Sequence, residues 1–315
     1  MRNNRSFWFV RRILSGVTVV WAAATFTFFT QFLMPGERAQ IIFNSRSGNV
    51  GDIPPGQLVA INAQYGFDQS VIMQYGRYIW GLLRGDLGQS YFQYQPVTKL
   101  IAEQIGPTIA LAFTALATAW VLTIVTTVLF AGRNNVGARA VSGLQLILAT
   151  LPPYWLATIL LVVFAIQLRW FPVVGGNTVM GLVLPTLALA LEIYGFLGQA
   201  VQSEFTRVLE QPFITSSRMR GSSDLSVRLR HVLRNAALPG ITLSGWMIGK
   251  LLSGAVLVEA VFGRQGLGVL LVAATNSRDV PVVSGLILVS AALFVVVSLV
   301  VDLAYQIIDP RIKVA

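Results

Sequence analysis

The chain has 315 residues, of which 55% are hydrophobic and only 11% are charged, and its mean hydropathy is +0.68. An ordinary soluble domain carries about 25% charged residues, so the composition excludes a soluble globular protein and indicates an integral membrane protein. The chain has no cysteine and one histidine, which excludes disulfides, thiol catalysis and a multi-histidine metal site within this chain. The net charge of +10 does not indicate a nucleic-acid partner, because the basic residues lie between apolar stretches.

Six apolar stretches are long enough to cross a membrane, which takes about 20 helical residues. They are residues 13–34, 107–131, 140–168, 179–201, 236–258 and 280–308. Pro152 and Pro153 interrupt the third, which we still predict to be one span. The first follows four arginines, but it is longer than the apolar core of a signal peptide, about 7–15 residues. We therefore predict a retained anchor.

The distribution of positive charge predicts the orientation, since cytoplasmic loops are rich in arginine and lysine. The segments on the side of the N-terminus hold 14 arginines and lysines, against 8 on the other side. Both termini are then cytoplasmic. The predicted organisation is a cytoplasmic N-terminus with the first span (1–34), an external, partly helical segment (35–106), and a five-helix core (107–315). A cytoplasmic loop lies at about 202–236 within the core.

The external segment contains a predicted amphipathic helix. Asp68 is a suitable cap for a helix that begins near Gln69. Apolar residues then recur at helical spacing on one face, namely Ile72, Tyr75, Ile79, Leu82 and Leu83. This pattern favours a helix lying on the outer membrane surface. The second interpretation is a docking surface for an external partner, and the two interpretations are compatible with each other.

The stretch SSRMRGSSDLSVRLRHVLRNAALP, residues 216–239, is an unusually basic module between two spans. We predict a short helix over residues 213–220, ended by Gly221 in a left-handed conformation. Ser222, Ser223 and Asp224 offer caps for a second helix. Its expected apolar face is Leu225, Leu229, Val232, Leu233 and Ala236, and its expected exposed residues are Arg228, Arg230, His231 and Arg234. Two interpretations stay open: a topology signal that contacts lipid phosphates, or a helix that enters a groove on a soluble partner.

No catalytic residues and no metal site are predicted. The sequence lacks the G-x-x-x-x-G-K-[ST] phosphate loop, and the glycines of GRQGLG (263–268) do not spell a dinucleotide fingerprint. Active transport by this chain would need energy from another chain or from an ion gradient.

Several stretches resemble one family in the same order along the chain. They are YGRYIWGLLRGDLGQSY (75–91), GPTIALA (106–112), LPPYWLATILLVVFA with WFPVVG, the basic module, GAVLVEAVFGRQGLG with RDVPVVSG, and VVDLAYQIIDPRIK. Together they are similar to membrane permeases of ABC importers in the dipeptide/oligopeptide/nickel group, specifically the first of the two paired permeases.

The resemblance implies an all-α membrane fold with six spans, like a type I ABC importer permease, in a prokaryotic plasma membrane. It implies a second homologous permease, cytoplasmic ATPase subunits of one or two kinds that bind ATP and Mg, and an external substrate-binding protein. This chain would need no cofactor and would not be an enzyme. The implied solute is a short peptide, and the alternative is nickel, a metal chelate or another peptide-like solute.

The resemblance also gives the basic module a role, since in such permeases the helix before the glycine docks on the ATPase. We carry this role to Ser216, Ser217, Arg218 and Gly221, with Arg220 adjacent.

Glu192 and Lys250 depart from the family pattern, since each places a charge in the middle of a predicted span. A lone charge there costs at least about 2.5–3.5 kcal/mol, so we predict that the two form an ion pair. The pair would either pin two helices together or line the solute path. Two other hypotheses remain: a secondary transporter that uses these charges to couple an ion, and a membrane scaffold that does not transport.

Overall fold

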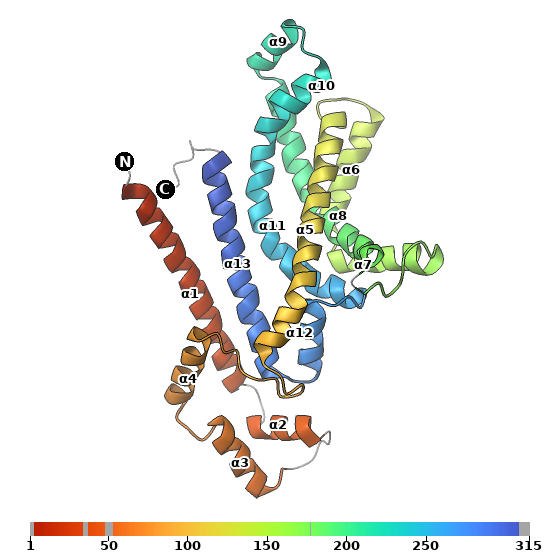
Figure 1. The fold of residues 1–315 in the computed structure, drawn as a ribbon. Helices are drawn as coiled ribbons and strands as arrows, with labels where there is room; N and C mark the ends of the chain where they lie inside the picture. Colours follow the sequence, from red (N-terminus) through yellow and green to blue (C-terminus); the bar gives the residue numbers. More distant parts are fainter. Residues whose placement is uncertain (1–2, 34–36, 48–52, 177, 309–315) are drawn as a thin grey trace. The chain divides into compact units, whose positions relative to one another are not determined.

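The computed structural model describes residues 3–33, 37–47, 53–176 and 178–308, which fold into helices joined by short connections (Figure 1). The chain divides into two compact units: Met1–Gly106 with Val269–Val296 (unit 1), and Pro107–Gly268 with Val297–Ala315 (unit 2). Among the residues used to predict the orientation, Arg2, Arg311 and Lys313 lie outside the described residues.

Unit 1 contains α1 (Asn3–Leu33), α2 (Arg38–Ser47), α3 (Pro55–Tyr65), α4 (Val71–Leu83) and the first parts of α5 (Val97–Phe130) and α13 (Val280–Ile308). The helices α1 and α13 approach closely at Gly16, where an added Cβ would lie 2.6 Å from Val295 Cγ1. Further along the same two helices, the Gln31 side chain donates a hydrogen bond to the Ser284 hydroxyl. A small residue therefore sets the spacing of these helices, and a polar contact fixes their register.

The predicted start of α4 was wrong. The helix begins at Val71 after Ser70, and Asp68 does not cap it. The side-chain amide of Gln74 donates to the carbonyl oxygens of Phe67 and Gln69, which holds residues 67–69 in a turn ahead of the helix. On the predicted face, Tyr75 packs on the ring of Phe28 and bonds to Thr25, whereas Ile72 stays 85% exposed.

Unit 2 contains most of α5, then α6 (Val136–Thr150), α7 (Pro153–Leu160), the π-helix η1 (Leu161–Gln167), α8 (Val179–Leu209), α9 (Pro212–Met219), α10 (Asp224–Ser226), the π-helix η2 (Val227–Val232) and α11 (Leu233–Val261). The helix α12 (Leu267–Asn276) begins at its boundary.

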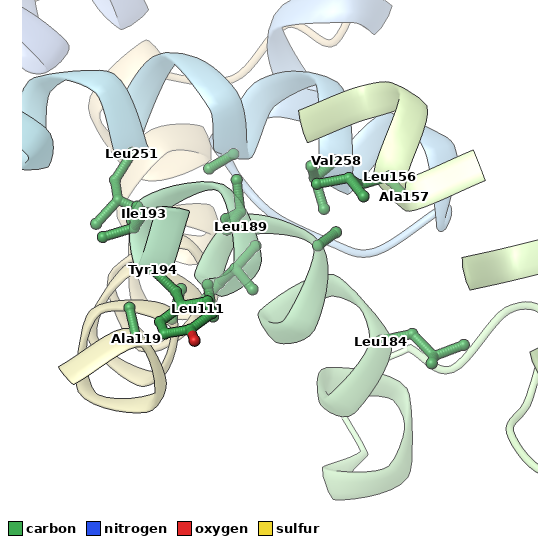
Figure 2. Packing of buried hydrophobic residues seen from close by; sticks show 14 of the residues in the cluster. Leu111, Ala119, Leu156, Ala157, Leu184, Leu189, Ile193, Tyr194, Leu251 and Val258 are labelled. Carbon is green, nitrogen blue, oxygen red and sulfur yellow. The ribbon is translucent and has the colours of Figure 1, made fainter. Parts of the chain in front are cut away.

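The core of unit 2 is built around α8, which packs against α6, α7 and α11. Leu189, Ile193 and Leu197 of α8 are almost fully buried, and so are Met247 and Leu251 of α11 (Figure 2). Gly195 lets α6 approach, because a Cβ there would clash with the backbone of Ala149. Small residues on α8 therefore allow close helix packing, as is common between membrane helices.

Four helical segments are long and apolar enough to cross a membrane, and up to six if two bent helix pairs each count as one span. The four are Val10–Leu33, Val97–Phe130, Val179–Leu209 and Val280–Val300. They match the predicted first, second, fourth and sixth spans.

The third predicted span is not one straight helix. Its two halves, Val136–Thr150 and Pro153–Gln167, meet at 110°. Leu151 is extended, with φ −81° and ψ 130°, as expected before a proline, and Pro152 and Pro153 cannot donate helical hydrogen bonds. The fifth span bends by 51° between Leu251 and Ser253. Pro152 and Pro153 therefore divide the third predicted span into two separate helices.

Candidate functional site

The predicted cytoplasmic loop at about 202–236 begins inside α8 and ends inside α11. The connection between these two helices, residues 210–232, here called the basic connection, contains two short helices around a glycine turn. At its start α9 covers Pro212–Met219, with Pro212 in the first turn. Gly221 follows at φ +85°, a left-handed conformation that favours glycine. The Ser223 side chain then accepts a hydrogen bond from Ser226 N at 3.4 Å. The helix–glycine–helix pattern agrees with the prediction, and α9 begins and ends one residue earlier.

The predicted face of the second helix was partly wrong. Val232 and Ala236 are buried as predicted, but Leu225 is 57% and Leu229 is 45% exposed. The reason is η2, a π-helix in which backbone hydrogen bonds join residues five apart. Its wider turn brings Val227 and Arg228 into the packed face, where both are buried.

Arg228 was predicted to be exposed and is instead only 5% exposed. Its Nη1 donates to the carbonyl oxygens of Val128 at 3.1 Å and Ala131 at 2.9 Å. These oxygens lie at the C-terminal end of α5, where backbone acceptors lack partners within the helix and a positive charge is stabilising. Arg228 therefore joins the basic connection to the end of α5 through two hydrogen bonds.

Asp224 links three arginines on the basic connection and the loop after α5. Its carboxylate lies 2.8 Å from Arg228 Nε, 3.0 Å from Arg218 Nη2 and 3.9 Å from Arg133 Nη2. Burial alone would raise the pKa of Asp224, but the hydrogen bonds and charges of Arg228 and Arg218 outweigh it and lower the pKa. The carboxylate therefore stays ionised and braces α9 against the following helix.

The residues predicted for docking do not share one surface. Ser216, Arg218, Arg220 and Gly221 are exposed, and Arg218 is held by Asp224. Ser217 is 3% exposed, and its hydroxyl donates to Ser222 Oγ at 3.3 Å.

Two apolar residues of α9 that sequence reasoning missed are exposed, Phe213 at 46% and Met219 at 83%. Phe213, Ser216 and Met219 recur every three residues, so their spacing already placed them on one side of a helix. We call the exposed set Phe213, Ser216, Met219 and Arg220 the α9 surface. Figure 1 shows α9 and α10 beyond the ends of the long helices α8 and α11.

Glu192 of α8 and Lys250 of α11 face each other. Lys250 Nζ lies 2.5 Å from Glu192 Oε1, and the two side chains are 34% and 8% exposed, respectively. Lys250 Nζ also lies 4.4 Å from the centroid of the Phe196 ring, a cation–π geometry. The pair joins the two helices of unit 2 that contribute most of its core.

Glu259, near the end of α11, is a second buried carboxylate that sequence reasoning missed. It is fully buried and accepts hydrogen bonds from Thr108 Oγ1 and from Gly268 N, each at 2.7 Å. Leu267 N donates in turn to Thr108 Oγ1 at 2.9 Å. The glycines after Glu259 are the sequence feature that could have indicated this buried carboxylate. They leave room for it, since a Cβ at Gly266 would clash with the Glu259 carboxylate.

Among the described residues, no cluster of three or more histidine, cysteine, aspartate or glutamate side chains could hold a metal ion. The chemistry that the described polar groups support is ion pairing and hydrogen bonding within the helices and at their ends.

Comparisons with known proteins identify the family. Residues 123–314 match the model described as binding-protein-dependent transport system inner membrane component, and residues 6–112 match the model of the N-terminal part of such membrane components.

Two relatives match almost the whole chain. A protein of Brucella abortus (strain 2308) with the provisional name peptide transport system permease protein is 34% identical over 313 residues, which is 96% of this chain and 98% of the relative. The glutathione transport system permease protein GsiC of Salmonella paratyphi A is 32% identical over 306 residues, again 96% of this chain and 98% of the relative.

A chain of the MetNI methionine ABC transporter, solved in inward-facing conformations, has a TM-score of 0.56 at 18% identity. The match covers 67% of this chain and 96% of that chain, and it shows a likeness of fold. With most of its length matched by the family models, this chain belongs to the binding-protein-dependent transport system inner membrane components, the membrane permeases of ABC importers.

Proposed function

We propose that this chain forms half of the translocation channel of an ATP-driven importer of short peptides and catalyses no reaction itself. The family membership supports a permease, and the names of two relatives, for peptide and for glutathione transport, support a peptide as solute. The partners would be a second homologous permease, cytoplasmic ATPase subunits of one or two kinds and an external binding protein. Both termini and the basic connection would then face the cytoplasm of a prokaryote.

The observation that carries the proposal is the bracing of α9. A docking helix transmits force only if it is held rigidly to the spans. Asp224 joins Arg218 of α9 to Arg228, and Arg228 is hydrogen-bonded to the end of α5. The α9 surface meanwhile exposes two apolar side chains, Met219 at 83% and Phe213 at 46%, as a helix that enters a groove on another protein would.

The roles of the predicted residues follow from this geometry. In the proposed complex Ser216 and Arg220 contact the ATPase together with Phe213 and Met219. Arg218, Ser217 and Gly221 act indirectly, because Arg218 is paired, Ser217 is buried, and Gly221 provides the turn.

The test uses the intact complex in lipid nanodiscs, with ATP hydrolysis measured with and without the binding protein and di- to pentapeptides. Met219→Glu should reduce the amount of ATPase that co-purifies and abolish peptide-stimulated hydrolysis. Val174→Glu is the matched control, because Val174 is an exposed apolar residue, at 70%, in another connection of the same unit.

Three results would count against parts of the proposal. Equal ATPase recovery for both variants would exclude docking through α9. Stimulation by a nickel chelate but not by any peptide would favour the alternative solute. Loss of uptake on adding an uncoupler, with ATP held constant, would favour coupling to an ion gradient.

A further inference from the structure

One face of α8 carries a continuous polar stripe over the C-terminal part of the helix, which continues eight residues past the predicted end of the fourth span at Val201. The stripe consists of Gln199, Gln202, Ser203, Thr206, Arg207 and Glu210. Their steps of three, one, three, one and three residues keep all six on one side of a helix. Glu192 lies seven residues before Gln199 and therefore on the same side of α8. Followed toward the start of α8, this side leads from the stripe to the Glu192–Lys250 pair.

The stripe forms one wall of an open groove of about 600 Å³, and the neighbouring helix α6 forms the other wall. From α6 come Ser142 and Gln145, again three residues apart. Gln202 Nε2 donates to Ser142 Oγ at 3.0 Å, which joins the two walls. A volume of this size lies within the range of about 300–1,000 Å³ that is usual for small-molecule sites.

The groove contains unused hydrogen-bonding capacity. Gln145 Nε2 donates to the Tyr194 hydroxyl at 3.3 Å, but the Oε1 atoms of Gln145 and Gln202 are buried and accept no hydrogen bond from the described residues. A buried acceptor without a partner costs about 1–3 kcal/mol. Water or a solute in the groove would remove this cost after a side-chain adjustment.

Lipid is an unsuitable neighbour for this surface. Moving an amide or hydroxyl from water into hydrocarbon without a hydrogen bond costs about 4–8 kcal/mol. On α6 Leu144 and Ile147, which lie on the side away from Ser142 and Gln145, are 49% and 57% exposed. The two kinds of exposed surface on one helix indicate that α6 faces hydrocarbon on one side and a polar medium on the other.

We propose that this groove lines the present chain's half of the solute path and binds the main-chain amides of the peptide through Gln199, Gln202, Ser203 and Thr206. The inference rests on the proposed function, which supplies the peptide. Amide and hydroxyl side chains both donate and accept, so they match peptide groups whatever the side chains of the solute. Arg207 adds little net charge at the end of the stripe, because Glu204 accepts hydrogen bonds from its Nε and Nη2.

The lack of cysteine in the chain allows a direct test. Single cysteines replace Gln199, Ser203 or Thr206 in the complex in nanodiscs, and a charged methanethiosulfonate reagent labels them. Labelling is read on this chain's own gel band. Leu144→Cys and Ile147→Cys are the controls on the apolar side of α6. Because the reagent needs a hydrated thiolate, stripe cysteines should react at least about tenfold faster than the controls.

The second readout is the solute itself. During ATP hydrolysis with the binding protein, added peptide should slow labelling of the stripe cysteines and leave the controls unchanged. The double variant Gln199→Leu/Gln202→Leu should lose most peptide uptake while keeping its ATPase subunits, whereas Leu144→Ala should lose none.

Failures of the two proposals are distinguishable. If the wild-type complex imports peptide but stripe and control cysteines react equally, or peptide gives no protection, the groove is not on the path. Normal uptake by the double leucine variant would overturn the inference as well. If the wild-type complex imports no peptide, the proposed function fails and this inference fails with it.

Discussion

Unit 2 buries two glutamates, Glu192 and Glu259, and gives them different partners. Glu192 faces the ammonium of Lys250 at 2.5 Å. Glu259 accepts two hydrogen bonds from neutral donors, one of them a backbone N–H, and the charge of the buried Arg264 acts on it without an ion-pair contact. The first arrangement is a side-chain pair between two helices, and the second is a cage of donors from α5 and from the first turn of α12.

The difference matters for what each site tolerates. A buried ion pair gains little net stability, because desolvation offsets the attraction, and removing both partners together is often tolerated. A cage that includes a backbone N–H cannot lose both partners, because no substitution removes the backbone donor. We therefore expect Glu259 to be the more sensitive position, although Glu192 is the one that stands out in the sequence.

The largest expected effect is that of Glu259→Ala. It leaves Gly268 N and the Thr108 hydroxyl without an acceptor and opens a cavity, so we expect a loss of about 5 kcal/mol. The thermal midpoint and yield of the purified complex measure it. Glu259→Gln, which keeps one acceptor oxygen, should be milder. An unchanged midpoint for the alanine variant would remove the distinction between the two glutamates.

Lys250→Met should have the next largest effect. It leaves the Glu192 carboxylate without its cation, and we expect about 3 kcal/mol, at the low end for a buried pair because Lys250 is partly exposed. Adding Glu192→Gln should recover at least about 1 kcal/mol of this loss. Thermal midpoints of the two single variants and the double variant test the coupling. Strict additivity would show that the two charges do not support each other.

Thr108→Val should cost about 2 kcal/mol, because Leu267 N loses its acceptor and Glu259 loses one donor. Thr108→Ser retains the hydroxyl and serves as the control. If valine and serine gave the same thermal midpoint, hydrogen bonding at Thr108 would not contribute to the cage.

Gly266→Ala should have the smallest effect of the four, about 1–2 kcal/mol, because the loop must shift to relieve the clash of the new Cβ with Glu259. Gly143→Ala is the matched control, since nothing lies near a Cβ added there. We expect that control to be neutral or slightly stabilising, as alanine favours a helix over glycine. A larger loss at Gly143 than at Gly266 would contradict the cage.

Much of the fold could be predicted from the sequence, because membrane spans depend on local composition. The apolar runs that became α1, α5, α8 and α13 were all found, and each prediction matches at least one observed helix end to within one residue. However, α1 and α5 begin ten residues earlier, and α8 ends eight residues later, than predicted. The glycine turn at Gly221 was found for a similar reason, since its signal is local. The 110° bend at Pro152 and Pro153 was underestimated, although its cause was visible.

The candidate site was predicted less completely, because side-chain partners depend on packing between distant segments. A helical period of 3.6 placed Arg228 on the surface, but η2 changes the period and turns Arg228 toward the carbonyl groups of α5. Thr108 and Glu259 are 151 residues apart in the chain, and no spacing rule connects them.

The sequence by itself determined that the chain is a membrane protein, where its apolar helices lie, and that a basic helix–glycine–helix module separates two of them. These properties depend on composition and on neighbouring residues. Only the tertiary structure decided that Asp224 and Arg228 brace α9, that Glu259 accepts hydrogen bonds from α5 and α12, and that polar residues of α6 and α8 share one groove. Each of these depends on which helices pack together, because helix packing brings residues far apart in sequence within hydrogen-bond distance.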